Sequence, residues 1–233
     1  MNAKSTTNEL IGINLLGEDE ERSVKTFATQ YRTAPAIPNL AQFLSAELHI
    51  ELVTDPDIVS GFASDESHLP GHAVGVCRPR TKRDVAAILR TCFLCGVPVT
   101  VCSGRSNLTG SATPDGGILL SLGSMTEPAF EIDEAAKTVT APVGMILEDL
   151  RKAVLSATGS RLSYPVDPTS RAEAAVGGTV SCNASGFTPG NPGATRDWVE
   201  RLEVVLPCGL LVSAVRGDIV SAEGKFVLRY GDR

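Results

Sequence analysis

The sequence has no apolar run long enough to cross a membrane and no dense cluster of lysine and arginine. A membrane-spanning helix needs roughly 18 or more consecutive apolar residues, which no stretch of the 233-residue chain approaches. Acidic residues outnumber basic ones by 27 to 21, giving a net charge of -6, so binding to a nucleic-acid backbone is disfavoured. Residues 1–20 lack the basic and apolar regions of a secretory signal. We therefore expect a cytoplasmic protein with no membrane span and no nucleic-acid partner.

The cysteines match neither a secreted disulfide framework nor a four-ligand zinc site. Only Cys92 and Cys95 are close in sequence, and they fall within an amphipathic helical pattern that places them on one face. No second pair of cysteine or histidine residues stands at the spacing of a zinc finger. We interpret both as buried small apolar residues and expect no metal site.

Residues 71–101 predict a strand, a helix and a second strand. Residues 73–77 form a short apolar run, and Thr81 followed three positions later by Asp84 is typical of a helix start. Apolar residues then recur at helical spacing up to Gly96, which favours a helix end, and residues 97–101 read as a strand. This order and length are those of a βαβ unit.

The rest of the chain predicts a mixture of short strands and helices. Strands are expected at 117–122, 129–133 and 138–141, helices at 39–52 and 145–157, and a hairpin at 201–206 and 210–215. The first thirty residues indicate a tail or weak helix. Residues 164–192 are rich in proline, glycine, serine and asparagine, with one short helix candidate at 173–182; so long a loop-rich stretch in a compact domain usually binds a ligand.

The segment 103–112 carries the clearest chemical signal. It reads Ser-Gly-Arg-Ser-Asn-Leu-Thr-Gly-Ser-Ala directly after a predicted strand. Small residues allow a tight turn whose successive N–H groups can hold a phosphate, and Arg105 could add positive charge. A plain surface loop is the alternative. The segment is neither a P-loop nor the dinucleotide fingerprint, so a doubly wound nucleotide fold is disfavoured.

Several segments follow one another between residues 60 and 215. They are Arg78-Pro79, Gly96-Val97-Pro98-Val99-Thr100, the 103–112 loop, Gly117-Ile118-Leu119-Leu120-Ser121-Leu122, Glu131-Ile132-Asp133, Thr138-Val139-Thr140, Gly144 with Leu147, Pro165-Val166-Asp167-Pro168-Thr169, Ala175-Val176-Gly177-Gly178, Asn183-Ala184-Ser185-Gly186, Gly193-Ala194-Thr195-Arg196-Asp197 and Val204-Val205-Leu206-Pro207. In this order they resemble FAD-binding domains of the vanillyl-alcohol oxidase and p-cresol methylhydroxylase (PCMH) type. The resemblance is closest to the group containing the glycolate oxidase flavin subunit and D-lactate dehydrogenase. It implies an α+β, two-subdomain PCMH-type FAD-binding fold with FAD extended between the subdomains.

The resemblance also implies which residues bind the cofactor. The backbone of residues 103–107 would hold the FAD pyrophosphate, and glycines near 177–186 would allow close approach to the flavin. The expected cofactor-binding residues are Ser103, Gly104, Arg105, Ser106, Asn107, Gly110, Asp167, Gly177, Gly178, Asn183, Gly186, Thr195 and Val205.

This chain departs from the family pattern in the pyrophosphate loop. The family's Gly-Gly-Gly-Thr is replaced by Ser103-Gly104-Arg105-Ser106, and Arg105 fits only with negative φ or with strain. The loop contains no histidine, because His49, His68 and His72 all lie upstream. We therefore expect FAD to be held non-covalently.

The expected organisation is an N-terminal tail and helix (1–59), an FAD-binding domain (60–217, with subdomains at about 60–160 and 161–217), and the start of a missing substrate region (218–233). The implied function is oxidation of a small 2-hydroxy acid, such as glycolate or D-lactate, by hydride transfer to flavin. No histidine–carboxylate cluster serves as a candidate base, so the catalytic residues stay unknown. The alternatives are a flavin-binding module or fragment without independent catalysis, which needs a partner subunit or self-association, and the related peptidoglycan-precursor reductase or sugar oxidase branch.

Overall fold

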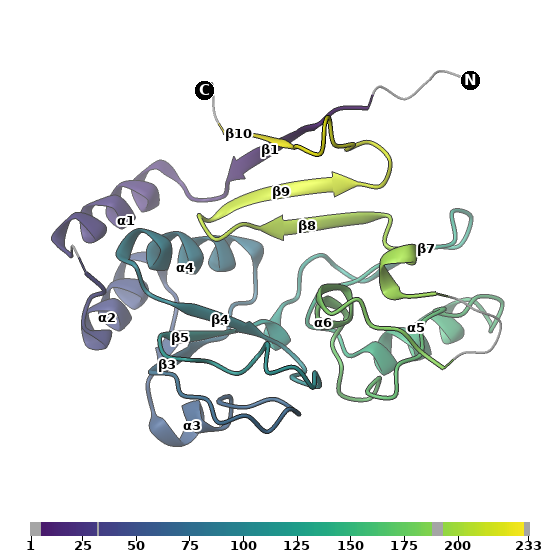
Figure 1. Cartoon of the computed structure of the whole chain (residues 1–233), viewed down its shortest axis with the longest axis horizontal. Helices are drawn as coiled ribbons and strands as arrows, with labels where there is room; N and C mark the ends of the chain where they lie inside the picture. Colours follow the sequence, from purple (N-terminus) through teal and green to yellow (C-terminus); the bar gives the residue numbers. More distant parts are fainter. Residues whose placement is uncertain (1–5, 32, 188–192, 231–233) are drawn as a thin grey trace.

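The computed structural model describes residues 6–31, 33–187 and 193–230. Three layers are visible in Figure 1: a lower sheet, a layer of helices centred on α4, and an upper sheet. Helices α5 and α6 and their loops lie beside these layers. The arrangement confirms the predicted α+β class.

The lower sheet has the strand order β2-β3-β5-β4, in which β3 and β4 both run parallel to the central β5. Helix α4 connects β3 to β4, so the predicted βαβ unit is confirmed. Thr81 and Asp84 form the capping box at its start, and Gly96 ends it with φ 68°. The elements are β2 (Leu52–Val53), β3 (Gly75–Cys77), α4 (Lys82–Cys95), β4 (Val99–Cys102) and β5 (Ile118–Ser121).

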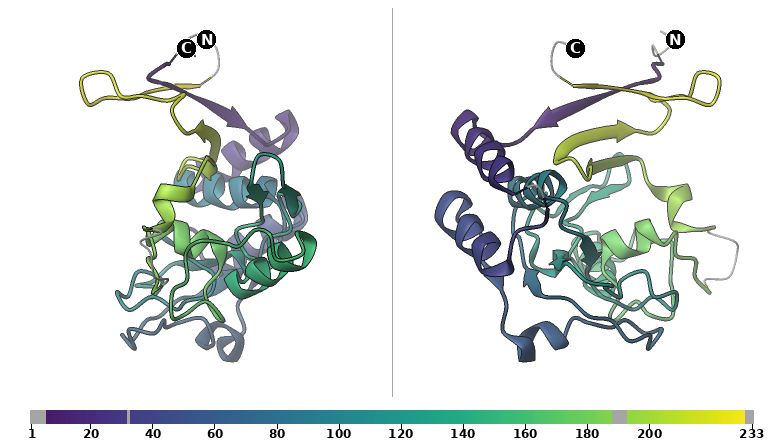
Figure 2. Two further views of the ribbon diagram at one scale, coloured as in Figure 1. Left: turned by 90° about the vertical axis from the view of Figure 1, so that its right-hand side faces the viewer. Right: turned by 60° about the vertical axis from the view of Figure 1, so that its left-hand side comes forward.

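The upper sheet has the order β10-β1-β9-β8 and joins segments from both ends of the described chain (Figure 2). The predicted hairpin of β8 and β9 is confirmed, and both strands contact α4. Segments 9–14 and 227–230, expected outside the FAD-binding domain, thus share a sheet with its hairpin. The strands are β1 (Glu9–Asn14), β8 (Arg201–Val205), β9 (Leu210–Val215) and β10 (Val227–Tyr230).

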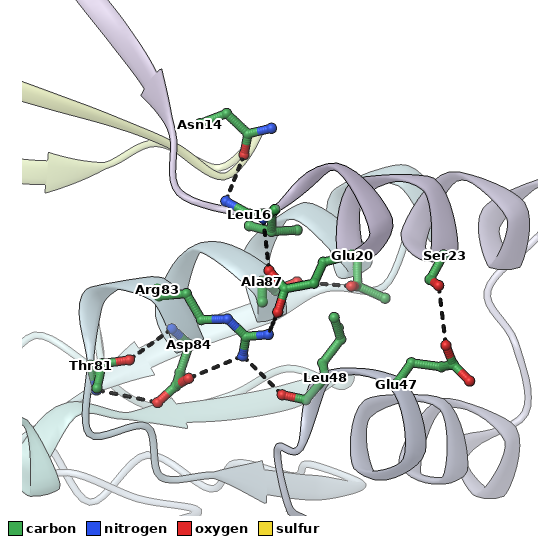
Figure 3. Close-up of polar contacts among 12 residues, drawn as sticks. Asn14, Leu16, Glu20, Ser23, Glu47, Leu48, Thr81, Arg83, Asp84 and Ala87 are labelled. Atoms are coloured by element: carbon green, nitrogen blue, oxygen red, sulfur yellow. Dashed lines mark hydrogen bonds and ion pairs between the residues drawn. The ribbon is translucent and has the colours of Figure 1, made fainter.

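The N-terminal helices α1 (Glu18–Gln30) and α2 (Ile37–Leu48) pack on α4. The Phe27 and Phe43 rings stack with centroids 4.1 Å apart. From α4, Arg83 donates to the carbonyl of Leu48 at 2.8 Å and pairs with Glu20 of α1, as Figure 3 shows. The sequence indicates a tail or weak helix for the first thirty residues. Residues 1–5 lie outside the described part of the chain, and residues 9–14 and 18–30 form β1 and a well-packed helix.

The remaining elements surround the loop-rich region. The predicted strands at 129–133 and 138–141 pair as a short ribbon, and the predicted helices at 145–157 and 173–182 appear with slightly narrower bounds. The short helix α3 was not anticipated. These elements are α3 (Pro56–Ser60), η1 (Leu122–Ser124), β6 (Glu131–Asp133), β7 (Thr138–Thr140), α5 (Leu147–Ala157), α6 (Val176–Ser181) and η2 (Thr195–Trp198).

The main apolar core lies between α1, α2, α4 and the lower sheet, and it contains Cys77, Cys92 and Cys95. All six cysteines are free, and Cys102 is also buried. Burial raises the pKa of the Cys77 thiol to about 12 and also raises that of Cys92. Cys92 and Cys95 are therefore buried in the apolar core, as the helical pattern predicts.

Candidate functional site

The loop after β4 presents a row of unused hydrogen-bond donors. In the described part of the chain, the backbone N–H groups of Gly104, Arg105, Ser106, Asn107 and Leu108 donate to no protein acceptor. Unpaired N–H groups in succession have a high desolvation cost unless water or a ligand accepts from them. Successive unpaired N–H groups in a turn can together hold an anion, above all a phosphate.

Arg105 adopts the left-handed conformation, with φ 53°. The sequence predicts backbone strain at this arginine unless its φ is negative. Because φ is positive, the loop adopts the strained conformation. Its guanidinium contacts the carbonyls of Gly61 and Ser64 and lies 5.1 Å from the centre of the Phe62 ring. The side chain is therefore engaged with the segment before β3 through its hydrogen bonds to backbone carbonyls.

Gly104 brings this loop against the segment that precedes α6. A Cβ atom at Gly104 would lie 2.1 Å from the Glu173 carbonyl oxygen and 3.0 Å from the Ala175 nitrogen. Only glycine allows this approach of two backbones. Gly104 and residues 173–175, about seventy positions apart in sequence, are consequently neighbours.

Gly177 and Gly178, at the start of α6, have different surroundings. Gly177 donates to the carbonyl of Val143 at 2.8 Å, and a Cβ atom there would lie 2.8 Å from the Val143 side chain. A Cβ at Gly178 would meet nothing within 4 Å, and its N–H has no acceptor among the described residues. Gly178 thus exposes bare backbone to open space beside the loop.

Asn183, Gly186 and Thr195 form a second group that follows α6. Asn183 has φ 49° and accepts from the N–H of Arg196 at 3.0 Å, while the buried Thr195 donates to the carbonyl of Ala184 at 2.8 Å. These bonds join the loop after α6 to η2.

Asp167 is held by the same region, but its carboxylate is directed to ion pairs. It lies 2.6 Å from Arg171 and 3.8 Å from Arg151 of α5. A Cβ at Gly186 would lie 2.4 Å from the Asp167 nitrogen, so the two backbones are in close contact. The carboxylate therefore serves the packing of this loop, and only the main chain of Asp167 is near the glycine segment.

Gly110 and Val205 lie apart from this arrangement. Gly110 turns the end of the loop with φ 75°. The Val205 side chain packs against the main core at the end of β8. Because β8 is the edge of its sheet, one row of its backbone groups has no partner strand.

One buried group in the loop lacks a partner and fits an anionic ligand. The hydroxyl oxygen of Ser103 is buried without a hydrogen bond. An orphaned hydroxyl in the same loop as the unused N–H donors is consistent with a ligand that carries phosphate. The unobstructed backbone at Gly178, in the helix that follows the segment packed on Gly104, is consistent with close approach of a second part of that ligand. The residues present therefore fit FAD.

Asp65 supports the loop from behind and was missed in the sequence analysis. The carboxylate accepts from the N–H of Ala112 at 3.2 Å and from the N–H and hydroxyl of Ser67. Burial opposes ionisation, but the bonds from Ser67, Ala112 and Asn107 prevail and lower the pKa of Asp65 to about 2. The signal was an aspartate two positions before a serine, the pattern of an Asx turn.

Among residues 6–31, 33–187 and 193–230, no group of three histidine, cysteine or acidic side chains is placed to hold a metal ion. In the same ranges, no helix is both long and apolar enough to cross a membrane.

The fold and this loop together define an FAD-binding domain of the flavoprotein oxidoreductases. Residues 73–214 match the FAD binding domain family, and the chain belongs to that family. Its structural neighbours include a chitooligosaccharide oxidase (TM-score 0.62, 18% identity, covering 84% of this chain and 38% of that one) and an alkyldihydroxyacetonephosphate synthase (TM-score 0.65, 16% identity, covering 84% and 41%). At such identity they show the fold alone, which is the predicted PCMH-type fold.

Relatives in sequence include enzymes of hydroxy acids. The chain is 35% identical to glycolate oxidase subunit GlcD of Bacillus subtilis over 64% of its own length and 30% of that protein. It is 29% identical to a D-2-hydroxyglutarate dehydrogenase of Xanthomonas citri (82% and 40%) and 30% identical to a D-lactate dehydrogenase of Anaerostipes hadrus (79% and 38%). The chain spans 30–40% of the length of these three relatives.

Proposed function

We propose that the chain binds FAD non-covalently, with the pyrophosphate on the N–H groups of residues 104–108, and contributes to the oxidation of a small 2-hydroxy acid. The unused donor row is the observation that carries this proposal. Its position after a parallel strand and its contact with the segment before α6 support an extended ligand that runs from residues 103–107 toward Gly178. FAD, when bound, supplies the acceptor for a hydride from the substrate carbon.

In this proposal, the chain's own groups bind FAD and orient it. Ser103 offers its hydroxyl to the phosphate end, and Gly178 offers its N–H and an unobstructed surface to the flavin end. Gly177, Asn183, Gly186 and Thr195 hold the backbone that lines this path, and the main chain of Asp167 packs against Gly186. Gly110 turns the end of the pyrophosphate loop. Val205 would contribute to FAD binding only through its main chain, which lies in the edge strand β8.

We include residues 60–217 in the proposal as the FAD-binding domain, with subdomains at about 60–160 and 161–217. The substrate class rests on the relatives, which include a glycolate oxidase subunit, a D-lactate dehydrogenase and a D-2-hydroxyglutarate dehydrogenase. A cytoplasmic location is also part of the proposal, supported by the free state of all six cysteines, which a reducing compartment favours.

The second candidate is a flavin-binding module that works with another polypeptide. Leu108 and Phe187 support it, because they lie next to the proposed site residues and are 77% and 79% exposed. Large apolar side chains so placed favour a covering protein surface. One relative is itself named as a subunit.

The test is to reconstitute the purified chain with FAD, remove free flavin, and record the visible spectrum before and after acid precipitation. We expect a retained flavin band that acid releases. Glycolate, D-lactate and D-2-hydroxyglutarate are then added without oxygen. Bleaching by one of them supports the oxidoreductase, a bound but unresponsive flavin favours the binding module, and no retained flavin contradicts both.

A further inference from the structure

Residues 61–67 contact loop 103–112 near both of its ends. This loop carries the unused N–H groups of residues 104–108. At one end, Arg105 donates to the carbonyls of Gly61 and Ser64, and its own carbonyl accepts from the N–H of Glu66 at 3.1 Å. At the other end, Asp65 accepts from the N–H of Ala112. The loop is therefore tied to this segment on both sides of Asn107.

The side chain of Asn107 is also committed within the loop. Its carbonyl oxygen accepts from the N–H and hydroxyl of Thr109 at 3.1 and 3.0 Å and from the N–H of Ser111 at 3.3 Å. With the Asp65 bond to Ala112, these contacts engage the N–H groups of Thr109, Ser111 and Ala112. The N–H groups of residues 104–108 have no acceptor among the described residues.

We propose that segment 61–67 is a brace for nucleotide binding, in which Asp65 and Arg105 are positioning residues that keep the N–H groups of 104–108 free and aimed at the ligand. This inference rests on the proposed FAD function. Phosphate is then recognised by backbone N–H groups, while the side chains of Arg105 and Asn107 hold the loop in shape.

Asp65 is the residue of the brace whose hydrogen bonds depend most directly on its chemical identity. Its two oxygens accept from donors of Ser67 and Ala112, and the Asn107 side chain also hydrogen-bonds to it. An asparagine has one acceptor oxygen and would turn an NH2 group toward one of these donors. Asp65→Asn therefore keeps the shape of the side chain but releases part of the loop.

The test compares three probes: FAD, ADP, which carries a pyrophosphate, and riboflavin, which carries no phosphate. Binding to the full chain is measured by calorimetry or by fluorescence quenching. For Asp65→Asn we expect FAD and ADP to bind about tenfold more weakly, equivalent to about 1.4 kcal/mol, with riboflavin affinity unchanged. Asp55→Asn is the matched control, because Asp55 accepts from the N–H of Asp57 in an equivalent turn away from the loop.

A uniform loss for all three probes, or no loss at all, would overturn the brace. Failure of the unaltered chain to bind FAD would instead remove the proposed function, so the two failures are distinguishable.

Arg105→Ala provides an independent test if Asp65→Asn does not fold. Arg105→Lys is the paired variant, because it keeps the positive charge but lacks the planar guanidinium fork that reaches both carbonyls. We expect the same selective loss for FAD and ADP in both variants. An Arg105→Lys variant that binds FAD as tightly as the unaltered chain would mean that the positive charge acts on the phosphate and that the contacts to Gly61 and Ser64 are not needed. That result would overturn the positioning role of Arg105.

Discussion

Gly178→Ala tests separately whether folding and whether FAD binding require a glycine at this position. Gly178 lies in α6, its φ is not in the left-handed region, and a Cβ there would meet no atom within 4 Å. Alanine is favoured over glycine within a helix by roughly 0.5–1 kcal/mol. The cofactor-free variant should therefore be slightly more stable, by about 0.5 kcal/mol, since the residue is in the first turn of a short helix.

The effect on FAD should have the opposite sign. If the flavin approaches the bare backbone at Gly178, a methyl group must push it away, and overpacking of this kind costs roughly 1–3 kcal/mol. That corresponds to roughly fivefold to 150-fold weaker affinity. Urea unfolding of the cofactor-free chain and titration with FAD give the two quantities separately.

Ser156→Ala is the matched control, since Ser156 is exposed on α5 and gains helix propensity in the same way. It should raise stability slightly and leave FAD affinity unchanged. An unchanged FAD affinity in Gly178→Ala would refute the assignment of this surface to the cofactor.

Three further predictions concern the packing of Gly104, the ionisation of Asp65 and the burial of the cysteines. Gly104→Ala should lower the free energy of unfolding by about 1–3 kcal/mol in urea titrations, because the Cβ would lie 2.1 Å from a backbone oxygen; an unchanged value would contradict the close packing of the two segments. The pKa of Asp65 is lowered to about 2, so its ionised form should stabilise the fold fully above the normal aspartate pKa near 4, and this contribution should be lost as the pH falls toward 2. In Asp65→Asn, the free energy of unfolding should therefore change less between about pH 4 and 2 than in the unaltered chain. A thiol reagent at neutral pH should modify the exposed Cys182 first and the buried Cys77 only after denaturation, as mass spectrometry of the labelled peptides would show; rapid labelling of Cys77 in the folded chain would contradict its burial.

Elements with local signals were predictable from the sequence. Helix α4 begins at a capping box and ends at a glycine, and its apolar residues recur at helical spacing. The β8–β9 hairpin has a glycine turn between two apolar runs. In both cases neighbouring residues determine the structure, so a sequence pattern is enough.

The N-terminal elements depend on distant partners. Strand β1 pairs with β9 and β10, about two hundred residues away, and no pattern within residues 9–14 reveals that pairing. Helix α1 is held by the stacking of Phe27 on Phe43 and by the Arg83–Glu20 contact. Tertiary packing supplies what the weak local pattern lacks.

The candidate site divides in the same way. The small residues of 103–112 predict a turn that can hold phosphate, and the structure shows its unused N–H groups. The direction of the Arg105 side chain was not predictable, because it depends on carbonyls about forty residues earlier in the chain. Asp65 was missed for the same reason: only the folded chain brings it to Ala112.

The most direct test of the account is a titration of the purified chain with FAD, followed by removal of free flavin and a visible spectrum. The account predicts one retained flavin per chain, released by acid and displaced by excess ADP, because both ligands use the N–H groups of residues 104–108. A chain that is folded by circular dichroism but retains no flavin would contradict it.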